Sequence, residues 1–89
     1  MNDQSKSVSF SADIRPLFRE VDVEHMKPLK VMLDDYNYMS DPKDDHDNAT
    51  NVQDYLVGNK TPRMPMGGPY WSKQQLDLYN KWMTDGYKP

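Results

Sequence analysis

The apolar residues near the end of the chain recur at the spacing of one face of an α-helix. Four residues form this face: Leu76, Tyr79, Trp82 and Met83. Ser72 stands at the N-cap position, and Gln75 follows three residues later, where it completes a capping box. Trp71 can pack on the first turn as part of a hydrophobic staple, and Gly86 favours the end of the helix. The pattern predicts a helix between Ser72 and Gly86.

A second amphipathic pattern lies near the start of the chain, in residues 11–21 (SADIRPLFREV). Its apolar residues share one helical face: Ile14, Leu17, Phe18 and Val21. Ser11 or Asp13 can cap a helix here, and Pro16 falls in or near the first turn, where a missing N–H group costs least. We therefore expect a first helix in residues 11–21, after a disordered tail formed by residues 1–8.

The middle of the chain carries weaker signals. Residues 34–39 fit a short helix, and residues 40–49 read as a polar, acid-rich loop. Thr50 begins a capping-box pattern that leads into apolar residues and a stop at Gly58. No segment alternates convincingly between apolar and polar positions, which a half-buried strand would do. We predict an all-α fold of three to five short helices, forming a single domain over residues 9–89.

The composition limits the chemistry that this chain can perform. With 89 residues, of which 36% are hydrophobic, the chain can build only a small core. Two Trp, six Tyr and seven Met must supply much of the burial. The chain has no cysteine. This absence excludes disulfides, thiolate zinc sites, cysteine nucleophiles and thioether attachment of a cofactor.

The charge pattern also excludes some partners. The formal net charge is −3, and the eleven Lys and Arg residues are scattered along the chain. A nucleic-acid surface should show a basic stripe, so we expect no nucleic-acid binding. No segment approaches the length of a membrane span, and the first ten residues lack the apolar run of a signal peptide. We therefore expect a cytoplasmic protein that does not enter a membrane.

Three motifs together resemble a known family. They are Asp13-Ile14-Arg15-Pro16-Leu17-Phe18, then Met64-Pro65 followed by Gly67-Gly68-Pro69, and finally Trp82-Met83-Thr84-Asp85-Gly86. This layout is similar to that of a small class I cytochrome c domain, and the resemblance spans roughly residues 9 to 88. It implies that the N- and C-terminal helices pack across each other, and that a methionine of the late loop occupies the position of an axial haem ligand.

The haem-attachment motif of that family is missing. The resemblance places Asp22 and His25 at its two cysteine positions and Met26 at its proximal histidine position. The chain thus resembles a small bacterial group of cytochrome c-like domains that are not expected to hold covalent haem. The vestigial haem site would consist of these residues: Asp22, His25, Met26, Met64 and Met66. Side chains would then have to fill the core in place of haem, and plausible fillers are Met26, Met32, Met39, Met64 and Met66, with Tyr36 and Tyr38.

Three interpretations of the methionines stay open. Thioethers with an imidazole suit Cu(I), so a copper site could form from four residues: His25, Met26, Met64 and Met66. A shifted register could instead give noncovalent haem a His/Met pair. The favoured alternative is that these methionines fill the vacated haem cavity and that no cofactor is bound.

Other charged residues offer weaker hypotheses. Five residues of the acidic stretch could hold a hard cation, namely Asp41, Asp44, Asp45, His46 and Asp47, but the glycine and glutamate of a calcium loop are missing. Asp22 and His25 have the spacing of a pair on one helix face, yet the simpler interpretation is that Asp22 caps a short helix and His25 is partly exposed. Arg63 could pair with Asp22 or Glu24.

The sequence favours a haem-free, cytochrome c-like domain that acts as a binding or protein-interaction module. Its partner would be another protein or a small ligand, and we expect neither enzymatic nor redox activity. The alternative is an electron-transfer protein or metal carrier that holds copper or noncovalent haem through Met and His.

Overall fold

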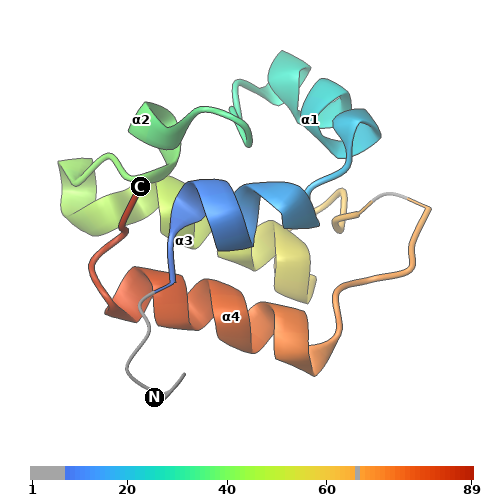
Figure 1. Ribbon diagram of the computed structural model, residues 1–89. Coiled ribbons are helices and arrows are strands. Elements are labelled where there is room, and N and C mark those ends of the chain that lie inside the picture. Colours follow the sequence, from blue (N-terminus) through green and yellow to red (C-terminus); the bar gives the residue numbers. More distant parts are fainter. Residues whose placement is uncertain (1–7, 66) are drawn as a thin grey trace.

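The computed structural model describes residues 8–65 and 67–89, and within these ranges the fold is all-α, as predicted. The elements in chain order are a π-helical turn η2 (Phe10–Ile14), the 3₁₀ turn η3 (Arg15–Leu17), α1 (Glu20–Met26), the 3₁₀ turn η4 (Lys27–Leu29), α2 (Tyr36–Met39), α3 (Lys43–Val57) and α4 (Lys73–Thr84). Figure 1 shows η2 and η3 lying along α4, with α3 behind them. None of the helices within these ranges is long and apolar enough to cross a membrane.

The final helix α4 follows its predicted pattern. The Ser72 hydroxyl accepts a hydrogen bond from the backbone N–H of Gln75 (3.2 Å), and the Gln75 side chain accepts one from the backbone N–H of Ser72 (2.8 Å). Tyr79 and Trp82 are fully buried on the predicted apolar face. Gly86 follows the helix with φ +106°, a backbone conformation that favours glycine. The capping box and the apolar spacing therefore predict this helix correctly.

The predicted single helix in residues 11–21 is wrong. Helical structure stops at Leu17, and Phe18 is extended (φ −91°, ψ 129°). Pro16 lies inside the helical residues, so its missing N–H group does not explain the break two residues later. Ser9 caps the first turn by accepting from the backbone N–H of Ala12 (3.3 Å). Of the two predicted residues, Asp13 takes part in the cap by accepting from the backbone N–H of Ser9 (2.9 Å), whereas Ser11 donates to the Pro89 carbonyl (3.2 Å).

The break gives α1 its own start and a different buried face. The carboxylate of Asp22 accepts a hydrogen bond from the backbone N–H of Arg19 (2.9 Å), which caps α1. Val23 and Met26 are buried on this helix, whereas Val21 is 51% exposed. The prediction that Val21 shares a buried face with Phe18 is therefore wrong, because the two residues belong to separate segments.

The helix α3 begins earlier than predicted. It starts at Lys43, although Thr50 carries the capping-box pattern. Three residues near its start have left-handed backbone angles: Asp44 (φ 54°), Asp45 (φ 60°) and His46 (φ 60°). The acidic residues show no apolar periodicity, so the sequence predicts a loop in residues 40–49. In the structure the chain turns at these three residues and then continues as a helix. The end of α3 at Gly58, where φ is +89°, agrees with the prediction.

The N-terminal turns and α4 share one core. The ring of Phe10 lies 5.6 Å from that of Trp82, and the ring of Tyr79 also lies 5.6 Å from Trp82. The carbonyl of Lys88 accepts hydrogen bonds from the backbone N–H of Phe10 and from the Trp82 indole, each 2.8 Å long. A β-bridge joins Ser9 and Lys88. The beginning and the end of the domain are thus held together by main-chain and aromatic contacts.

Candidate functional site

Asp22 is a buried charge whose partner is close to it in sequence. Its side chain is 2% exposed. One oxygen accepts from the Arg19 backbone N–H (2.9 Å) and from Nε (3.1 Å), and the other oxygen accepts from Nη2 (2.8 Å). The hydrogen bond to Asp22 raises the pKa of the Arg19 guanidinium above its ordinary value. Asp22 therefore caps a short helix, as the simpler interpretation predicts. The guanidinium group of Arg19 compensates its charge.

The two methionines of the vestigial haem site lie in the core. Met26 and Met64 are each 1% exposed and belong to one continuous apolar cluster. The backbone N–H of Met64 donates to the Tyr55 carbonyl (2.9 Å), which fastens the methionine loop to α3. Met39 is also fully buried, whereas Met32, Tyr36 and Tyr38 are half-buried. Met66 lies outside the described residues.

His25 does not share this buried environment. It is exposed, although Met26 beside it is buried. A His/Met centre needs the imidazole and the thioethers to face one point. Covalent haem also lacks its cysteines. Among the described residues, no three His, Cys, Asp or Glu side chains are grouped so that they could hold a metal ion. His25 and the two buried methionines therefore lie in different environments.

The acidic residues near the start of α3 have no such grouping around His46 either. The imidazole of His46 instead stacks on the ring of Tyr87, with 3.7 Å between the ring centres and 3° between their planes. Asp22 and His25 do not form an acid–base pair, because Asp22 is buried against Arg19 and His25 is exposed. The structure thus gives the hard-cation and catalytic hypotheses no organised site within the described ranges.

Arg63 has a different partner from those predicted. Its guanidinium lies 4.1 Å from the centre of the Tyr70 ring. Glu24 pairs with Lys27 (3.4 Å), and Asp22 pairs with Arg19. A pair between Arg63 and either carboxylate is therefore not found. The stacking instead places a cation beside an aromatic residue that is 51% exposed.

An open pocket of about 200 Å³ lies beside this aromatic residue. The segment around the start of α1 contributes Leu17, Arg19 and Asp22. The loop before α4 and the first turn of that helix contribute Pro65, Pro69, Tyr70, Trp71 and Gln75. The sequence does not predict this pocket. The only signal for it is that its segments carry positions of the vestigial haem site: Asp22 lines the pocket, and Met64 directly precedes Pro65, which also lines it.

Comparison of the chain with known protein families, with curated proteins and with solved structures finds no match. Function must therefore be inferred from the chemistry of the site itself.

Proposed function

We propose that the protein is a haem-free, cytochrome c-like domain of the cytoplasm that acts as a binding or protein-interaction module, without redox chemistry of its own. One observation carries the proposal: Met26 and Met64 are packed into the core, while the two segments that carry them leave an open pocket at the surface. The methionines are used for stability, and the pocket is accessible to a partner.

Burial energies support the part of this proposal that says the domain is haem-free. Fully burying a methionine side chain contributes about 1.5–3 kcal/mol. A haem placed between Met26 and Met64 would have to displace apolar side chains that now contact one another in the core cluster. Without thioether bonds, only packing and axial ligands would compensate for that loss. A filled core is therefore the more stable arrangement for this sequence.

The burial pattern also supports the likeness to cytochrome c. In the motifs that carry the resemblance, Ile14, Phe18 and Trp82 are all buried. The N-terminal turn η2 contacts α4, as the resemblance implies for the first and last helices.

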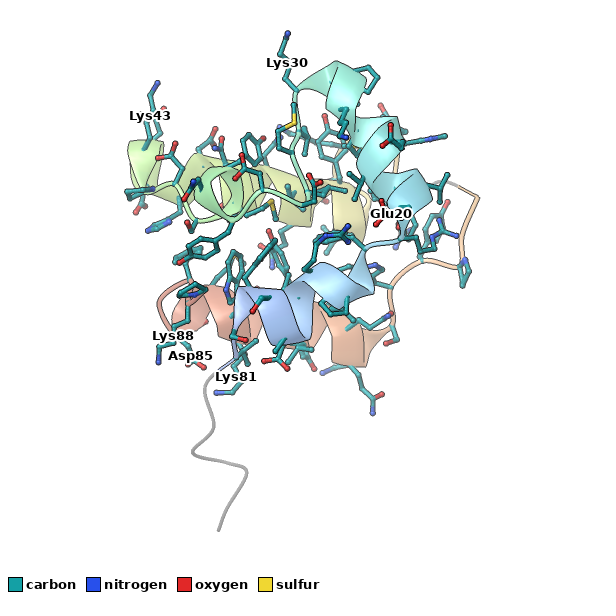
Figure 2. All side chains as sticks on the ribbon, turned by 45° about the horizontal axis from the view of Figure 1, so that its top comes forward. Glu20, Lys30, Lys43, Lys81, Asp85 and Lys88 are labelled. Carbon is teal, nitrogen blue, oxygen red and sulfur yellow. The ribbon has the colours of Figure 1, made fainter. Side chains whose placement is uncertain are left out.

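The distribution of basic residues supports a partner other than nucleic acid. Figure 2 shows Lys30 and Lys43 pointing outward from different parts of the molecule, and Lys81 and Lys88 near another edge. Lys81 is paired with Asp85 (3.0 Å). These positions do not form the continuous stripe that a phosphate backbone requires. A protein partner or a small ligand suits this surface better.

A haemin and Cu(I) titration of the purified protein tests the proposed function. We expect no Soret band beyond that of free haemin and no stoichiometric copper binding. A Met64→Leu variant should lose less than about 1.5 kcal/mol of unfolding free energy, because it replaces one buried apolar side chain by another of similar volume. Urea unfolding followed by circular dichroism measures that change.

A cofactor role would give a different result. If the protein binds haemin or copper with one-to-one stoichiometry and Met64→Leu abolishes binding, the electron-transfer or metal-carrier alternative is correct. Met39→Leu is the matched control, since Met39 is equally buried but lies outside the vestigial haem site.

A further inference from the structure

We propose that the pocket between the start of α1 and the loop before α4 binds an acidic peptide segment of another protein, with one aromatic side chain of that segment inserted as an anchor. This inference deepens the proposed function and depends on it, because it names the partner of the binding module. The size, the walls and the charge of the pocket each support it.

The pocket is too small for a drug-sized ligand. Its volume of about 200 Å³ is below the roughly 300–1,000 Å³ of ordinary small-molecule sites. It is also open to solvent on one side, since Tyr70 in its wall is half exposed. A pocket of this kind suits a single side chain presented by a larger partner. Interface anchors are most often aromatic residues that fill such pockets.

The walls of the pocket are apolar and firmly supported. Trp71 is 7% exposed, and its ring lies 5.2 Å from Phe18 and 6.2 Å from Tyr79 in the core. Pro65 is buried in the wall, whereas Pro69 is exposed at its edge. Proline rings and aromatic rings offer flat apolar surfaces that a planar side chain can cover without ordering flexible groups.

The charge beside the pocket indicates which residues of the bound peptide should flank the anchor. The carboxylate of Asp22 is compensated by Arg19, so this pair leaves no net charge in the pocket wall. Arg63 stacks on Tyr70 and has no carboxylate partner among the described residues. Arg63 therefore places a positive charge beside the pocket, on a protein whose net charge is −3. A carboxylate beside the anchor is therefore favoured at this place.

The side chain of Arg63 lies against Gly58. Gly58 has no side chain, and a Cβ atom there would lie only 3.0 Å from Cδ of Arg63 and 3.1 Å from Nε. The arginine side chain occupies this free space and covers the Tyr70 ring. Because these contacts restrict the side chain, Arg63 should lose less side-chain entropy than an unsupported arginine when it pairs with an incoming carboxylate.

The experiment is a ¹H–¹⁵N NMR titration with three blocked tripeptides, acetyl-Glu-Trp-Glu-amide, acetyl-Lys-Trp-Lys-amide and acetyl-Glu-Ala-Glu-amide. We expect the first to bind with a dissociation constant of about 1 mM or tighter, a range that such titrations resolve. Its shifts should centre on Tyr70, the Trp71 indole and Gln75. The other two peptides should bind several-fold more weakly, because one has the wrong charge and the other lacks the anchor.

Variants separate the contributions of the aromatic wall and of the Arg63 charge to peptide binding. Tyr70→Ala should weaken the acidic tryptophan peptide about fivefold or more, because it removes an aromatic wall. Arg63→Gln should weaken it roughly two- to fivefold, as expected for one exposed ion pair, and Arg63→Lys should restore most of the loss. Lys43→Gln removes the same charge at a site outside the pocket, and it should leave binding unchanged. Circular dichroism shows whether each variant is folded.

Four results would overturn the inference: no shifts with the acidic tryptophan peptide, shifts centred elsewhere, equal binding of the lysine peptide, or equal loss in Lys43→Gln and Arg63→Gln. Shifts that instead depend on protein concentration would show that a second copy of the chain occupies the pocket. These outcomes would show that the pocket does not bind an acidic peptide with an aromatic anchor. They would not contradict the proposal that the domain is a binding module. Only haem or copper uptake in the earlier titration rejects the module itself.

Discussion

Three N–H groups of one neighbouring residue surround the buried carboxyl group of Asp22. The backbone N–H, Nε and Nη2 of Arg19 all donate to its two oxygens. Burying a charge without such partners would cost several kcal/mol. The compensation is local, so Asp22 adds no net field to the pocket beside it. The sign of the charge that an incoming partner meets is then decided by Arg63.

A second paired carboxylate, Asp85, makes stability depend on pH. The hydrogen bond from Lys81 lowers the pKa of Asp85 below its ordinary value. Because the folded-state pKa is depressed, the pair contributes stability above the unfolded pKa, near 4, and this contribution is lost as the pH falls through the lower folded pKa. Urea unfolding should show that the protein is more stable than Asp85→Asn at pH 6 and that this difference disappears between about pH 4 and pH 2.

The control for this pH effect is Lys81→Gln, which removes the partner of Asp85 and leaves its carboxylate in place. That variant should lose the same pH-dependent part of the stability, because the pKa of Asp85 then returns toward its ordinary value. A stability difference between the protein and Asp85→Asn that stays constant from pH 6 to pH 2 would show that the Lys81 pair does not act through ionisation.

At the scale of elements, local signals predict α4 and the end of α3 but not the start of the chain. Ser72 and Gln75 exchange side-chain to backbone hydrogen bonds within one helical turn. The signal for the start of this helix therefore lies entirely in the local sequence. The break at Phe18 depends on which side chains the core accepts. Residues 11–21 carry a good apolar period, yet burying Phe18 and Met26 together requires an extended residue between two helical segments. Periodicity alone cannot show this.

Removing the α4 cap should have a measurable cost. Ser72→Ala removes the acceptor for the backbone N–H of Gln75 and should lower the unfolding free energy by about 1 kcal/mol. Equilibrium urea unfolding measures the change. Gln74→Ala is the matched control, because Gln74 is exposed in the same turn and should change stability by less than about 0.5 kcal/mol. Equal costs for the two variants would mean that the capping box does not stabilise α4.

At the scale of the whole molecule, the sequence predicts the fold class, and of the residues that line the pocket it singles out only Asp22 as a candidate site residue. It correctly predicts all-α structure, and it points to Asp22 and to the loop around Met64 as functional positions. It does not predict the pocket, because the pocket exists only where the start of α1 meets the loop before α4. The sequence does anticipate the environments of two neighbouring residues, because it favours a partly exposed His25 and counts Met26 among the core fillers, and the structure agrees with both.

The aromatic centre of the molecule gives a test of its hydrogen bonding. Trp82→Phe keeps a ring in the core but removes the indole N–H that donates to the Lys88 carbonyl (2.8 Å). It should lower the unfolding free energy by about 2–4 kcal/mol, from a cavity and a lost hydrogen bond. Trp71→Phe is the control: it shrinks a ring of the same core, and its indole has no hydrogen bond within the described ranges. A smaller loss for Trp82→Phe than for Trp71→Phe would show that the Lys88 contact is not stabilising.

The pairing of Ser9 with Lys88 also has a consequence for engineering. Residues 9 and 88 are neighbours across a β-bridge, so the described chain leaves the domain close to where it enters. A host protein with a surface loop could carry this domain as an insertion, because both junctions would fall at one place on the host. The same proximity would allow a short linker to join residues 9 and 88 directly, with new chain ends opened elsewhere in the sequence.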